Sequence, residues 1–108
     1  MIPLRDVIRN GGPPQLTADV TFYPTSSGGK KLAAAPGWGC PCCCSKSLPV
    51  NGWDGWPLLE RPLAPGDQRR LGFVFLSGEE AVTELRKAGK FYLWDGSFIG
   101  EAVIVEQL

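Results

Sequence analysis

The chain has 108 residues, which is enough for one domain with its own core and too few for two. Eleven basic and eleven acidic side chains cancel, and this balance removes a strong electrostatic case for non-specific DNA binding. Histidine is absent, so Ser-His-Asp and Cys-His triads, imidazole acid–base chemistry and histidine-ligated zinc are excluded.

The start of the chain carries charges where a signal peptide needs an unbroken apolar stretch. No window approaches the run of about eighteen apolar residues that a membrane-spanning helix needs. We therefore expect a cytoplasmic protein that does not enter a membrane. Gly11-Gly12-Pro13-Pro14 predicts a boundary between a lead segment, residues 1–14, and a domain over residues 15–108. Within the lead segment, the pattern favours one helical turn around Leu4 to Ile8.

The first half of the domain predicts short strands separated by turns. Leu16 to Tyr23 is rich in β-branched and aromatic residues and favours a strand that ends at Pro24. A second short strand is predicted over Lys30 to Ala35, and the small apolar stretch Cys40 to Ser45 predicts a buried strand. Residues 51–57 contain turn-forming residues and two tryptophans, which predicts a loop.

The second half predicts a strand over Arg70 to Leu76, then one short helix near residues 78–88. Ser77 and Glu80 have the spacing of a capping box, in which the serine caps the helix and the glutamate reaches back. Gly89 is placed to end the helix in a left-handed conformation.

The last segment predicts a hairpin. Phe91 to Trp94 and Phe98 to Val105 flank Asp95-Gly96, a dipeptide that type I′ turns prefer. Recurring turns between short strands, with one inserted helix, predict an all-β fold rather than a βαβ sheet. We expect a small, closed or partly open antiparallel β-barrel.

Three stretches also resemble, in order, segments of one known domain: Ala18–Tyr23 followed by Gly28-Gly29-Lys30-Lys31, Pro36–Pro41, and Pro65-Gly66-Asp67 with the ending Phe91–Val105, which contains Gly100-Glu101-Ala102. Together they resemble the C-terminal (third) β-barrel domain of elongation factor Tu-like translation GTPases. The resemblance covers most of the chain from Leu16 onward, and we expect this barrel to be a stand-alone domain.

The chain departs from that family at positions that bear on function. It contains no Gly-x-x-x-x-Gly-Lys-Ser/Thr loop, so we expect no nucleotide as a partner. In the family, the region of the Gly-Gly-basic turn helps to contact the T-stem of aminoacyl-tRNA. Here Lys31 replaces the family's histidine and Cys40 replaces its arginine, which leaves RNA binding open.

All four cysteines lie between Cys40 and Cys44. Four thiolates suit zinc or copper(I), but Cys40, Cys42 and Cys44 would follow one face of a strand at steps of about 6.6 Å. Sulfur ligands lie about 2.3 Å from a zinc ion, so such steps are too wide for one site. Because Cys43 would point away, we expect reduced, buried thiols without metal and keep a metal site as the alternative.

Seven residues are candidates for contacting a partner. Exposed tryptophans often anchor protein interfaces, and basic side chains meet RNA or acidic proteins. The candidates are Trp38, Trp53, Trp56, Lys30, Lys31, Arg69 and Arg70. Trp94, in a strand before a turn, is assigned a structural role.

Catalysis has little support in this sequence. The adjacent carboxylates Glu79 and Glu80 fit the start of a helix, and the cysteines have no imidazole to activate them. We expect no enzyme and no cofactor, but a non-catalytic module that binds a protein. A toxin-immunity protein is one form of such a module. The alternatives are an RNA-binding module related to translation and a cysteine-cluster metal or redox module.

Overall fold

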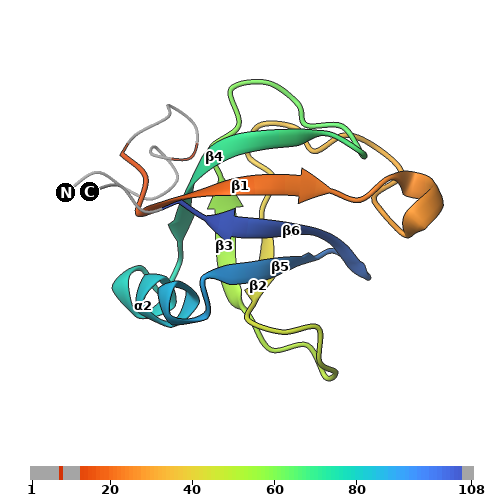
Figure 1. The fold of residues 1–108 in the computed structure, drawn as a ribbon. Coiled ribbons are helices and arrows are strands. Elements are labelled where there is room, and N and C mark those ends of the chain that lie inside the picture. Colours follow the sequence, from red (N-terminus) through yellow and green to blue (C-terminus); the bar gives the residue numbers. More distant parts are fainter. Residues whose placement is uncertain (1–7, 9–12, 106–108) are drawn as a thin grey trace.

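The computed structural model describes Ile8 and residues 13–105. Its elements are β1 (Leu16–Phe22), the 3-10 turn η1 (Thr25–Ser27), β2 (Cys40–Cys43), β3 (Trp53–Pro57), β4 (Gln68–Phe75), α2 (Glu79–Ala88), β5 (Lys90–Trp94) and β6 (Phe98–Ile104). The six strands close into an antiparallel barrel in the order β1-β4-β3-β2-β5-β6 (Figure 1). The predicted all-β barrel with one short helix is thereby confirmed.

Aromatic rings fill the interior of the barrel. β1 alternates strictly between buried and half-buried positions, so one face of the strand forms the core. Phe22, Phe73, Phe75 and Phe91 are almost completely buried, and the ring centroids of Phe73 and Phe91 lie 5.2 Å apart in an edge-on contact. Among the described residues, no polar or charged side chain is buried. Apolar side chains therefore fill the described interior of the barrel.

The helix α2 lies beside β5 at the side of the barrel (Figure 1) and buries Ala81, Val82 and Leu85. Gly89 ends it as predicted, at φ 77°, with its N–H donating to the carbonyl oxygen of Leu85 at 2.9 Å. The capping-box prediction was wrong. Gly78 is the N-cap and no side chain caps the helix, because Ser77 belongs to the preceding turn, in which the Gly78 N–H donates to Phe75.

Two predictions about strands were wrong. Residues 51–57 are not all loop, because β3 pairs on one side with β2 and on the other with β4, and this pairing outweighs local turn propensity. Gly55 suits the position, since a Cβ there would lie 2.6 Å from the ring of Phe75. Lys30 to Ala35 is not a strand, because only Ala34 forms a β-bridge, an isolated one with Leu63.

The β5–β6 hairpin is confirmed, but its turn is not type I′. That turn needs a positive φ at both central residues, and among the described residues only glycines have one. Trp94 pairs with Phe98, so the turn holds three residues, of which Gly96 alone has a positive φ, at 77°. Asp95 has a negative φ, and its carboxylate contacts Lys30 and Trp38.

The predicted lead segment falls outside the described residues except for Ile8, Pro13 and Pro14, as does most of its predicted helical turn. No helix in the described part of the chain is long and apolar enough to span a membrane.

Candidate binding surface

The seven candidate residues do not form one surface. Lys30 and Lys31 line an open pocket of about 350 Å³ together with Asp95. Arg69 and Arg70 line a different open pocket of about 490 Å³. Trp53 and Trp56 belong to β3, and Trp38 lies in the connection that precedes β2.

Each of the three candidate tryptophans is half-buried and packed against its neighbours. Trp38 meets Phe22 edge-on, with ring centroids 5.6 Å apart. Trp53 packs against the core and lines a third open pocket of about 350 Å³ beside α2. Trp56 lies over Gly39. Packing therefore accounts for much of their surface.

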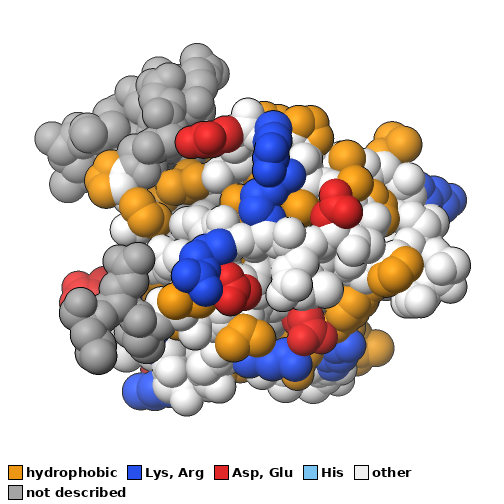
Figure 2. Space-filling view, turned by 45° about the horizontal axis from the view of Figure 1, so that its top comes forward, with side chains coloured by type: hydrophobic (Ala, Val, Ile, Leu, Met, Phe, Trp, Pro, Cys, Tyr) orange, Lys and Arg blue, Asp and Glu red, His pale blue; other side chains and the backbone are white. Residues whose placement is uncertain are grey.

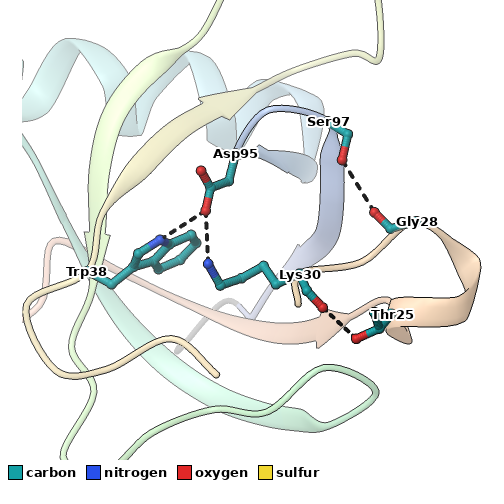
Figure 3. A network of polar contacts seen from close by, with 6 residues as sticks. All are labelled: Thr25, Gly28, Lys30, Trp38, Asp95 and Ser97. Atoms are coloured by element: carbon teal, nitrogen blue, oxygen red, sulfur yellow. Dashed lines mark hydrogen bonds and ion pairs between the residues drawn. The ribbon is translucent and has the colours of Figure 1, made fainter. Parts of the chain in front are cut away.

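Lys30 belongs to a network that joins the connection after β1 to the β5–β6 turn (Figure 3). Its Nζ lies 2.9 Å from Oδ2 of Asp95 and 5.1 Å from the ring centroid of Trp38. The indole N–H of Trp38 donates to the same oxygen at 3.4 Å, and the Ser97 hydroxyl donates to the Gly28 carbonyl at 3.3 Å. Because the Lys30 side chain is only 15% exposed, its ammonium stabilises the fold more than it offers charge to a ligand.

The two candidate arginines are also engaged. Arg69 donates to the carbonyl oxygens of Arg61 and Pro62, both at 2.9 Å. Arg70 donates from two nitrogens to the carboxylate of Asp19, at 2.8 and 3.2 Å, and this hydrogen bonding lowers the pKa of Asp19. Figure 2 shows basic and acidic side chains next to one another on the face in view, with apolar side chains between them.

The cysteines divide between the two faces of β2. Cys40 and Cys42 belong to the core as predicted, and the Cys42 thiol donates to the Cys40 carbonyl at 3.6 Å. Cys43 is buried outside that core cluster. Cys44 was expected on the inner face but is exposed, because the strand ends at Cys43 rather than Ser45.

Burial governs the chemistry of these thiols. It raises the pKa of Cys43 to about 11, and it also raises the pKa of Cys42 and of Cys44. Thiols with raised pKa values are poor nucleophiles and poor metal ligands at neutral pH. In the part of the chain that the structure describes, no three side chains of the His, Cys, Asp or Glu type gather to hold a metal ion.

The β5–β6 hairpin carries a row of outward-facing side chains that was not predicted from the sequence. We call it the hairpin face; it consists of Lys90, Tyr92, Trp94, Phe98, Glu101 and Val103. Cross-strand pairing places Tyr92 opposite Glu101 and Trp94 opposite Phe98. The rings of Trp94 and Phe98 meet edge-on with centroids 4.9 Å apart.

Alternation along β5 was the signal that could have revealed this face. Phe91 and Leu93 point into the core, so Tyr92 and Trp94 must point outward. Trp94 was assigned a structural role because it stands in a strand. In the structure it is half-buried on the outer surface, where it packs on Phe98 and still faces solvent.

Tyr23 and Lys46 extend the hairpin face at its edge. The Tyr23 hydroxyl donates to Oε1 of Glu101 at 2.9 Å, and Nζ of Lys90 lies 2.9 Å from Oε2. The hydrogen bonds from Lys90 and then from Tyr23 lower the pKa of Glu101, so this carboxylate is ionised at neutral pH. Nζ of Lys46 lies 4.7 Å from the ring centroid of Tyr23 and 5.2 Å from that of Tyr92.

No protein-family model matches the sequence, and the search of curated proteins found no match. The resemblance to the third domain of elongation factor Tu therefore stays a prediction.

Proposed function

We propose that this chain is a non-catalytic binding module that contacts a protein partner through the hairpin face. One observation carries the proposal. Aromatic side chains stand half-buried on the outside of the hairpin, at Tyr92, Trp94 and Phe98, although phenylalanines already fill the inside of the barrel. These outer rings exceed what the core needs.

The composition of the hairpin face fits a protein better than other ligands. Tyrosine and tryptophan are the residues that most often dominate the binding energy of protein interfaces. Val103 adds an apolar side chain that is 48% exposed, and Lys90 and Glu101 add charges of both signs. Mixed charges of this kind select a partner by complementarity. A toxin-neutralising immunity protein is one form that such a module takes.

RNA binding has less support. It depends on cations that are free to neutralise phosphates. Of the four predicted cations, Lys30 is paired with Asp95, Arg70 is paired with Asp19, and Arg69 is bound to backbone carbonyls. These contacts would have to break before the side chains could bind phosphate.

Affinity capture from the native cell with matched variants tests the proposal. We expect the wild type and the Lys31→Ala control to retain the same protein partner, and Trp94→Ala to lose it while keeping the circular dichroism spectrum of a folded barrel. Retention of that partner by Trp94→Ala contradicts the assigned surface. Recovery of RNA instead, released steeply by added salt, supports the RNA-binding alternative.

A further inference from the structure

We propose that Tyr23, Tyr92 and Glu101 form a binding site for the ammonium group of a partner's lysine, and that Lys46 of the chain itself occupies this site in the free protein. The proposal rests on the proposed function, since it names the chemistry by which the hairpin face recognises its protein partner. We call the three residues the ammonium site.

Two aromatic rings and one carboxylate converge at the ammonium site from different strands. Tyr23 directly follows β1, whereas Tyr92 belongs to β5 and Glu101 to β6. The Lys46 ammonium lies 4.7 and 5.2 Å from the two ring centroids, inside the range of about 6 Å in which a cation is attracted to a ring face. An ammonium group therefore already sits between the rings.

The walls of the ammonium site are held by contacts that do not involve Lys46. One oxygen of Glu101 accepts the Tyr23 hydroxyl and the other faces Lys90, which also lies 5.4 Å from the ring of Tyr92. The ring of Tyr92 packs edge-on against Phe98, with centroids 6.4 Å apart. The site is thus preformed, and it keeps its shape when its occupant leaves.

Side-chain contacts hold Lys46 in place, namely the two tyrosine rings, a hydrogen bond with Tyr23 and the charge of Glu101. Lys46 is exposed and belongs to the connection between β2 and β3, residues 44–52, which projects below the barrel in Figure 1. Within the described residues, none of the backbone–backbone hydrogen bonds outside helices and strands involves residues 44–51. This connection can therefore withdraw Lys46 without breaking a backbone ladder.

A lysine from a partner offers the same ammonium group, so it competes with Lys46 on equal chemical terms. Two residues further along the connection, Leu48 is 72% exposed and offers an apolar contact to an incoming segment. The ammonium site then acts as a selective element, because a partner gains from it only by presenting a cation. Because Lys46 competes for the site, it lowers the apparent affinity of every such partner.

A titration of the chain alone, followed by NMR, tests the ammonium site without any partner. The probe is Nα-acetyl-lysine methylamide, and Nα-acetyl-norleucine methylamide is the matched ligand without a charge. In Lys46→Ala we expect saturable shifts at Tyr92 and Glu101 with the lysine probe, and an affinity at least about fivefold higher than in the wild type, where Lys46 competes. A further Tyr92→Leu change should abolish these shifts, whereas Trp56→Leu in the same background should leave them.

Equal affinity in the wild type and Lys46→Ala overturns the proposal. So does the absence of saturable shifts in Lys46→Ala, or an equal response to the norleucine probe. Any of these results leaves the capture experiment with Trp94→Ala untouched, so the failure of the ammonium site and the failure of the proposed function can be told apart.

Discussion

The two long connections at the ends of β2 are built in opposite ways. In the connection that precedes β2, residues 23–39, the N–H groups of Ser27, Gly28 and Gly29 donate to carbonyl oxygens of Pro24 and Thr25. Ala34 exchanges two hydrogen bonds with Leu63. The connection that follows β2, residues 44–52, makes no such bonds over residues 44–51 within the described chain.

The difference decides what a lysine does in each connection. Lys30 is held by the carboxylate of Asp95 and stacks on Trp38, so it belongs to the structure. Lys46 rests on two tyrosine rings from an exposed and loosely tied segment, so it can be exchanged for another cation. A lysine therefore stabilises the fold in the first connection, whereas in the second a lysine occupies a site from which another cation can displace it.

Amide hydrogen exchange should separate the two connections most strongly. The Ala34 amide donates to Leu63 at 2.9 Å, and we expect it to exchange at least about a hundredfold more slowly than the amides of residues 45–48. Heteronuclear NMR after transfer into deuterated water measures both. Similar rates in the two connections would remove the basis of the comparison.

Gly29→Ala tests the tight geometry of the first connection. A Cβ at this position would lie 1.9 Å from the backbone oxygen of Tyr23, so the backbone must shift, and we expect a loss of about 3 kcal/mol in the free energy of unfolding. The neighbouring Gly28→Ala is the control. Its Cβ meets nothing within 4 Å, but its φ of 91° costs about 1 kcal/mol. Urea denaturation measures both, and equal losses would contradict the structure of this turn.

Asp95→Ala should cost about 1 to 2 kcal/mol in unfolding free energy, because it leaves Lys30 and the Trp38 indole without their shared acceptor. The ion pair of Glu84 with Lys87 on α2 is the comparison, since both of its side chains are well exposed. We expect Glu84→Ala to cost about 0.3 kcal/mol. If Asp95→Ala proved equally mild, the first connection would not depend on its ion pair.

Lys46→Ala should have the smallest effect on stability, about 0.5 kcal/mol or less, because the ring contacts and the Tyr23 hydrogen bond of this exposed lysine are screened by solvent. Thermal and urea unfolding of this variant and of Lys46→Arg, which retains a cation, provide the measurement. A loss well above 1 kcal/mol would show that Lys46 is a structural tie like Lys30.

Much of the fold follows from local patterns in the sequence. The β-branched and aromatic residues between Leu16 and Tyr23 identified β1, and the glycine at position 89 identified the end of α2, because strand propensity and left-handed glycines act locally. The strand β3 escaped prediction because its Asp-Gly content resembles a turn, whereas its pairing with β2 and β4 is decided by distant residues.

The candidate surface was harder to predict than the fold. Sequence singled out residue types, namely tryptophans and cations, but which cations are free depends on partners far along the chain. Lys30 and Asp95 are 65 residues apart, and Tyr23 and Glu101 are 78 apart. Such pairs become visible only when the barrel closes. The hairpin face, in contrast, could have been found from the alternation along β5.

Alternate positions of β5 are under different constraints, because one set packs in the interior and the other lies on the outer surface. This arrangement affects which positions can change in sequence during evolution. Phe91 and Leu93 must fit a closely packed interior, where a change in side-chain volume destabilises the fold. Tyr92 and Trp94 alternate with them on the same strand, but their side chains point outward and do not pack in the core. New specificities can therefore arise by substitution at every second residue of the hairpin while the barrel goes on folding as before.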